Sequence, residues 1–236
     1  MRFNDRPNDQ PRLLSCKPSI NRYAWGSCIF EMGHTKVHCT AAVTDKLPRW
    51  RKESGEGWVT AEYRMLPHST HTRGRREGDA LKGRTSEIQR LIGRSLRAAV
   101  DMKALGGWQI TIDCDVLQAD GGTRTASING GYIAMVLAMK HMVSEGHLDK
   151  LPLINSIAAV SVGIVDGKPM SDLCYEEDFA AAVDLNLVMT GDGRLVEVQG
   201  TAEEEPFSIT ELNELIKIGL PAIEMVSTLQ TEVLGR

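Results

Sequence analysis

The chain has 236 residues, of which 42% are hydrophobic and 25% are charged, and its formal net charge is −4. This length can bury a substantial core in one domain or in two closely packed halves. The net charge excludes a uniformly basic coat for nucleic acid, but it allows a local basic patch. The five cysteines are odd in number and lack CxxC spacing, which favours buried free thiols over disulfides or zinc.

The N-terminal segment, residues 1–10, is polar and carries no hydrophobic signal core. We therefore expect a loose arm there. No apolar run in the sequence approaches the roughly 18 residues that span a bilayer. Together with the free thiols, these features predict a cytoplasmic protein without a membrane partner.

Four segments in the first part of the chain have the composition of strands and are bounded by turn residues. They are residues 13–19, 26–32, 36–43 and 58–65. Residues 64–84 then lack apolar periodicity and are rich in glycine and basic side chains, among them Arg73, Arg75, Arg76 and Arg84. An isolated basic loop is usually a solvated surface. Because this one leads directly to Arg84 at the start of a helix, we favour a groove for a phosphate backbone.

The sequence predicts a helix over residues 85–100, with Ser86 and Gln89 as a capping box. Its buried stripe recurs at helical spacing and comprises Ile88, Leu91, Ile92, Leu96 and Ala99. Another face carries Arg90, Arg94 and Arg97. We expect these arginines to be solvated or paired across a subunit interface, with contact to RNA as the alternative.

The connection after residues 108–117, which alternate as a strand, carries the clearest chemical signal. Gly121 and Gly122 follow the strand, and Arg124 precedes a helix whose apolar positions begin at Ile128. Free N–H groups at a helix start, a close backbone approach and a cation suit an oxyanion such as phosphate. The alternative is an ordinary turn in which Arg124 pairs locally. No P-loop lysine follows the glycines, so the sequence predicts phosphate as a bound reactant and not as part of a nucleotide cofactor.

The second part of the chain repeats the pattern of strands and one long helix. Predicted strands cover residues 157–165, 168–172, 184–190 and 194–200. Ser208 and Glu211 form a second capping box, and Gly219 with Pro221 is expected to break the following helix before it resumes over residues 222–234. We infer a pseudo-duplicated α+β fold of mixed sheet and helix layers, with halves at about 10–105 and 106–236.

Acidic side chains gather around the predicted strand ends at Asp172, Asp178 and Asp184. Converging carboxylates repel one another, and a divalent cation such as Mg²⁺ or Mn²⁺ relieves that repulsion. The alternative is an acidic surface loop, to which Glu176 and Glu177 are assigned. The histidines at 34, 38, 68 and 71 lack a Ser or Cys partner pattern, so the sequence predicts no covalent nucleophile.

Long collinear motifs of this chain resemble those of the ribonuclease PH family over essentially the full length. They are residues 57–63, 65–73, 83–92, 113–127, 172–178 and 197–203. The resemblance implies one domain, 1–236, with the ribosomal protein S5 domain 2-like fold shared by polynucleotide phosphorylase and the exosome core. It also implies a homo-hexameric ring built as a trimer of dimers.

The resemblance further implies a phosphorolytic 3′→5′ exoribonuclease. Such an enzyme trims tRNA precursors and other RNA with a free 3′ end, uses inorganic phosphate to release nucleoside diphosphates, and can run in reverse. Family positions for phosphate match Arg84, Gly122, Thr123 and Arg124. Catalytic and metal positions match Asp172 and Asp178, with Asp184 as a further metal ligand, and Arg73, Arg75 and Arg76 are expected to bind RNA.

The chain departs from the family pattern at His68, where a basic residue is usual, and in a slightly shorter loop before Gly83. Two other functions remain open from the sequence. One is a catalytically silent RNA-binding subunit of an exosome-like ring. The other, a small-molecule phosphotransferase, lacks a lysine motif that would cradle a nucleotide.

Overall fold

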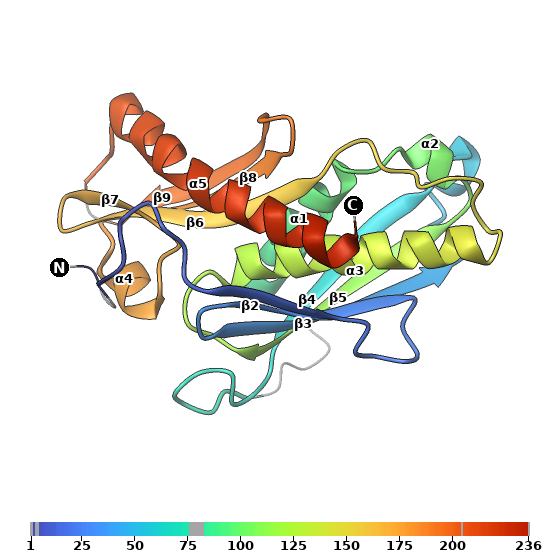
Figure 1. Cartoon of the computed structure of the whole chain (residues 1–236), viewed down its shortest axis with the longest axis horizontal. Helices are drawn as coiled ribbons and strands as arrows, with labels where there is room; N and C mark the ends of the chain where they lie inside the picture. Colours follow the sequence, from blue (N-terminus) through green and yellow to red (C-terminus); the bar gives the residue numbers. More distant parts are fainter. Residues whose placement is uncertain (1, 3–4, 76–82, 204, 236) are drawn as a thin grey trace.

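A computed structural model of the chain describes every residue except 1, 3–4, 76–82, 204 and 236. It contains two β-sheets with helices packed between and against them (Figure 1). The buried residues of both sheets and of the three long helices form one large apolar cluster. The α+β class with mixed sheet and helix layers, predicted from the sequence, is confirmed.

The first sheet has five strands in the order β1-β2-β3-β5-β4. They are β1 (Leu14–Pro18), β2 (Gly26–Met32), β3 (Thr35–Thr44), β4 (Trp58–Met65) and β5 (Gln109–Gln118). Strands β4 and β5 run parallel, and the other neighbours are antiparallel. A parallel pair needs a crossover, which contains α1 (Gly83–Arg97) and α2 (Met102–Leu105). A short 3₁₀ turn, Lys52–Ser54, precedes β4.

The second sheet is antiparallel throughout, in the order β7-β6-β8-β9. Its strands are β6 (Ile157–Val165), β7 (Lys168–Ser171), β8 (Val183–Thr190) and β9 (Leu195–Ala202). The short helix α4 (Tyr175–Ala180) connects β7 to β8. Strand β5 lies beyond the expected boundary at 105/106 but joins the first sheet, so the two sheets do not follow that boundary.

Helix α3 (Thr123–Ser144) lies between the sheets (Figure 1) and is buried on nearly all sides. It packs against β2, β3 and β5 of the first sheet and against β6 of the second. A helix that is apolar all round belongs in a core of this kind. This position fixes the start of α3, where the predicted anion turn lies, with respect to both sheets.

Helix α5 (Ile209–Leu234) runs unbroken through Pro221, so the predicted break at Gly219 and Pro221 was wrong. The cost of an internal proline, about 3 kcal/mol, is offset by burial of one apolar face against β6 and β7. That face includes Leu215, Ala222, Ile223 and Val226. The capping box of Ser208 and Glu211 is confirmed.

Helix α1 begins at Gly83, so Ser86 lies inside its first turn, and the predicted capping box there was wrong. Its buried stripe is confirmed. Arg94 pairs within the chain, with its Nε 2.9 Å from Glu197 Oε2. Arg97 lies over the ring of Trp58, 4.4 Å from the centroid.

The described residues of the N-terminal arm are docked and not loose as expected, since Arg2 is 7% exposed and Arg6 pairs with Asp172 and Glu177. In Figure 1 residues 5–12 pass beside α4 before the chain enters β1. The five cysteines are free, and all but Cys16 are buried, as predicted. Within the described part of the chain, no helix is long and apolar enough to cross a bilayer.

Candidate active site

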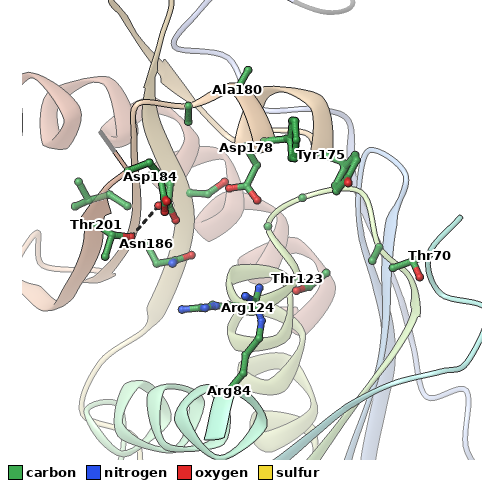
Figure 2. A pocket seen from close by; sticks show the side chains of 18 of the residues that line it. Thr70, Arg84, Thr123, Arg124, Tyr175, Asp178, Ala180, Asp184, Asn186 and Thr201 are labelled. Carbon is green, nitrogen blue, oxygen red and sulfur yellow. Dashed lines mark hydrogen bonds between the residues drawn. The ribbon is translucent and has the colours of Figure 1, made fainter. Parts of the chain in front are cut away.

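A cavity of about 770 Å³ is lined by residues from both sheets and from the starts of α1 and α3. Figure 2 shows its lining side chains. Strand β5 ends at one wall of the cavity, and the turn into α3 uses Gly121 and Gly122, both with φ in the left-handed region (71° and 63°). A Cβ on Gly121 would lie 2.3 Å from the carbonyl oxygen of Leu173. Only glycine fits this close approach.

The predicted phosphate residues Arg84, Gly122, Thr123 and Arg124 all line this cavity. Figure 2 shows Arg84 from α1 and Arg124 from α3 extending into the same space. The first-turn N–H groups of α3 have no acceptor within the helix and can therefore donate to a ligand. Cations and free N–H groups at one place are suited to a bound oxyanion.

Neighbouring side chains hold two members of this group in place. Arg124 Nη1 donates to Gln199 Oε1 at 3.1 Å and lies 3.4 Å from Glu87 Oε1. The hydroxyl of Tyr63 donates to Thr123 Oγ1 at 3.0 Å. Burial raises the pKa of Tyr63, so this phenol stays a proton donor. Arg124 thus pairs locally, as expected for an ordinary turn, and also lines the cavity.

Asp178 of α4 and Asp184 of β8 line the opposite side of the cavity (Figure 2). Burial and the charge of Asp184 raise the pKa of Asp178, while Arg84 and Arg124 oppose that rise. The two carboxylates and the two arginines therefore share one electrostatic environment. Asp184 Oδ1 accepts a hydrogen bond from Thr201 Oγ1 at 3.1 Å.

Asp172 does not line the cavity, although the sequence grouped it with Asp178 and Asp184. It is 0% exposed and has a left-handed φ of 53°. Its Oδ1 lies 2.7 Å from Arg12 Nη2, and its Oδ2 accepts from Arg12 Nε at 2.9 Å. Burial alone would raise the pKa of Asp172, but Arg12 and Arg6 hold it below its usual value. Both of its carboxylate oxygens are paired with arginines of the chain itself.

Glu177 is buried as well, and its assignment to an exposed acidic loop was wrong. Its Oε1 lies 2.8 Å from Arg2 Nε, and its Oε2 lies 3.0 Å from Arg6 Nη2. Arg2, Arg6 and Arg12 of the N-terminal arm thus neutralise Asp172 and Glu177, on either side of α4's start. We call the described residues of this arm, residue 2 and residues 5–12, the N-terminal strap.

The strap also connects α4 to the glycine turn. Arg12 Nη1 donates to the carbonyl oxygen of Asp120, next to Gly121. Asp120 Oδ1 in turn accepts the N–H of Tyr175, the first residue of α4, at 3.2 Å. The turn that carries the phosphate residues and the helix that carries Asp178 are therefore joined by direct hydrogen bonds.

The predicted RNA-binding residues Arg73 and Arg75 are not among the residues that line the cavity. Arg73 and Arg75 are exposed, and Arg73 lines a shallow depression together with Leu66, Pro67 and His68. Arg76 lies outside the described residues, as does part of the basic loop.

Sequence reasoning missed Arg12 and Asp120 as members of the site. The only signal was the cluster of arginines in a polar arm, and nothing in it identified a partner 160 residues away. The structure also brings Asn186 and Thr70 into the cavity lining. Asn186 lies outside the motifs of the family resemblance, and Thr70 lies within one of them, residues 65–73, without having been assigned a role.

The family model "3′ exoribonuclease family, domain 1" matches residues 10–140, and "domain 2" of the same family matches residues 155–222. Together they cover most of the chain and both walls of the cavity. The chain belongs to the 3′ exoribonuclease family.

Two bacterial relatives agree with this over their full lengths. The chain is 52% identical to ribonuclease PH of Caulobacter vibrioides, with 100% of both proteins covered. It is 51% identical to ribonuclease PH of Bdellovibrio bacteriovorus, with 100% of this chain and 97% of that protein covered. The activity expected from the sequence is confirmed at this level: the chain is a phosphorolytic 3′→5′ exoribonuclease that uses phosphate as co-substrate.

The fold is also found in a solved assembly. A chain of the structure "Archaeoglobus fulgidus exosome with RNA bound to the active site" superposes with a TM-score of 0.81 at 21% identity. The match covers 96% of this chain and 91% of that chain. At this identity the likeness shows a common fold, as predicted from the sequence.

Proposed function

We propose that Arg84 and the turn Gly122–Arg124 seat the attacking phosphate, and that Asp178 and Asp184 act on the opposite side of the same cavity. The observation that carries this proposal is that one cavity is lined by all of these residues. The arginines neutralise the phosphate through charge-assisted hydrogen bonds, so that one polyanion can approach another.

The reaction follows from this arrangement. An oxygen of the bound phosphate attacks the phosphorus of the last internucleotide linkage. The bond from that phosphorus to the 3′-oxygen of the preceding nucleotide breaks, and a nucleoside diphosphate leaves. The shortened RNA needs a proton on its new 3′-oxygen. The solvent supplies this proton, because Asp178, proposed below as a metal ligand, must be ionised to bind a cation.

For the metal we propose Asp178 and Asp184 as the ligands. Among the described residues, no three His, Cys, Asp or Glu side chains form a cluster that could hold a metal. Two carboxylates beside a phosphate site still suit Mg²⁺ or Mn²⁺, because Mg²⁺ in particular is often held by one or two carboxylates, substrate oxygens and water. The ion would stabilise negative charge on the scissile phosphate.

The family resemblance implied a catalytic and metal-binding role for Asp172, and this proposal gives it a different one. We assign it as a positioning residue, because Arg12 grips both Asp172 and the carbonyl oxygen of Asp120. The pair holds α4 against the glycine turn, which sets the separation between Asp178 and the bound phosphate.

For the substrate we propose tRNA precursors and other RNA with a free 3′ end. Arg73 and Arg75 are exposed and would contact the phosphate backbone, together with Arg76 outside the described residues. Such contacts are salt-dependent and tolerant of sequence. We also propose a hexameric ring, on the basis of the family resemblance, and a cytoplasmic location, on the basis of the free thiols.

The test is to identify the nucleotide released from a short RNA with and without inorganic phosphate. We expect nucleoside diphosphates, and only when phosphate is present. Nucleoside monophosphates released at the same rate without phosphate would show hydrolysis and contradict the proposal. The absence of any release would favour the silent RNA-binding subunit.

A further inference from the structure

Two aromatic side chains of α4, Tyr175 and Phe179, line the cavity and take no part in the steps above. Phe179 is 83% exposed and Tyr175 is 49% exposed. Their ring centroids lie 6.3 Å apart with 30° between the ring planes. Two adjacent rings that stay exposed to water do not gain the free energy of burial. Exposed apolar surface of this kind is typical of a contact with a ligand or a partner.

The two rings flank the proposed reaction centre. Tyr175 and Phe179 are four residues apart, a spacing that places both side chains on one side of a helix, and Asp178 directly precedes Phe179. Figure 2 shows Tyr175 and Asp178 projecting from the same helix. A third ring, that of His71, meets Tyr175 edge-on at 6.1 Å and comes from the segment that carries Arg73.

Resting on the proposed function, we propose that Tyr175 and Phe179 form a stacking platform for a nucleobase at the 3′ end of the RNA. Arginine contacts hold phosphates, but they do not fix the rotation of the last nucleotide. A base stacked beside Asp178 fixes that rotation and brings the scissile linkage in line with the bound phosphate. Every base has a π-face, so the platform accepts all four bases.

The occupant is a base of the RNA and not a second copy of the chain. The rings border a cavity that also contains two arginines and two carboxylates, a polar setting that suits a nucleotide better than the apolar centre of a subunit interface. The experiment below separates the two occupants.

The test uses short RNAs that carry 2-aminopurine as the last or the second-last base. Binding is measured in phosphate-free buffer, so the RNA is not phosphorolysed. We expect the unaltered protein to quench the fluorescence at one of the two positions, because stacking quenches this base. Phe179→Ala and Tyr175→Ala should remove the quenching and weaken binding by about 5- to 150-fold. Phe179→Trp should retain both, and Phe179→Leu, which is apolar but has no ring, should not.

A salt series provides the matched control. Phe179→Ala should leave the slope of log affinity against log salt concentration unchanged, since a stacked base releases no counterions. Arg73→Ala should reduce that slope by about 1. Phe179 is exposed, so its replacement leaves the core intact.

The platform is wrong if Phe179→Ala binds RNA as tightly as the unaltered protein, or if abasic residues at both positions cost the unaltered protein nothing. A change in sedimentation without a change in RNA affinity would also overturn it, by showing that Phe179 contacts a neighbouring copy. A protein that quenches 2-aminopurine but releases no diphosphate when phosphate is added would contradict the proposed function and support the platform.

Discussion

Arg124 belongs to the proposed phosphate site and also contacts side chains outside it. It lines the cavity and is held by Gln199 and Glu87. We predict that Arg124→Ala raises the KM for phosphate by about 10- to 100-fold, the effect of losing a charge-assisted hydrogen bond. RNA affinity in phosphate-free buffer should change little. Steady-state kinetics with Arg94→Gln as the control, whose pair with Glu197 lies outside the cavity lining, would check this. An unchanged KM for phosphate in Arg124→Ala would contradict it.

Gly121 tests the geometry of the turn itself. Its φ of 71° is strained for any other residue, and a Cβ would collide with the backbone of Leu173. We predict that Gly121→Ala loses more than about 2 kcal/mol of stability and most of its activity. Gly107→Ala is the control, because nothing lies within 4 Å of a Cβ there. Denaturant unfolding compares the two, and equal midpoints would refute the expectation.

The pairing of Asp172 with Arg12 predicts a particular dependence of stability on pH. The folded-state pKa of Asp172 is lowered, so its contribution is present above the unfolded value of about 3.9 and is lost as pH falls through the folded value. We predict that Asp172→Asn is about 3–5 kcal/mol less stable at pH 7, as expected when a buried pair loses one partner. The difference from the unaltered protein should shrink below about pH 4. Urea unfolding at several pH values measures it, and a difference independent of pH would contradict the pairing.

At the scale of elements, the strap determines where α4 lies. Arg2 and Arg6 are the cationic partners of Glu177, the residue before Asp178. We predict that the double substitution Arg2→Gln, Arg6→Gln lowers kcat by about tenfold or more, because α4 loosens. The KM for phosphate should change less, since the side chains proposed to bind phosphate belong to α1 and α3.

The control for the strap is Lys36→Gln, which removes a pair with Glu31 whose side chains are 40% and 31% exposed. Such a pair contributes about 1 kcal/mol or less, and kcat should not change. A double strap variant with the kcat of the unaltered protein would show that α4 holds its position without the strap.

The elements also show what a sequence can and cannot predict. The strand, turn and helix at the proposed phosphate site were predictable, because Gly121, Gly122 and the apolar positions of the following helix are contiguous in the sequence. The inward turn of Asp172 was not, because its left-handed φ and its partner 160 residues away leave no local signal. The prediction at Pro221 failed for the opposite reason. An internal proline is a strong local signal for the end of a helix, but packing of α5 on the second sheet overrides it.

At the scale of the whole molecule, several large apolar side chains are exposed away from the cavity: Leu13, Tyr23, Trp50 and Ile209 are each at least 64% exposed. Surfaces of this kind fit an assembly of several copies. We predict that sedimentation at working concentration gives the mass of a hexamer of the 26.0 kDa chain. A protein that stays monomeric while fully active would contradict a required ring.

The strap has a consequence for the order in which the protein is made. Arg2 and Arg12 leave the ribosome before their partners Glu177 and Asp172, which follow 175 and 160 residues later. The first sheet can form while synthesis continues, but the strap has no acidic partner until residues 172–177 have emerged. The distance between the proposed phosphate site and α4 is therefore fixed only after the first sheet has been made.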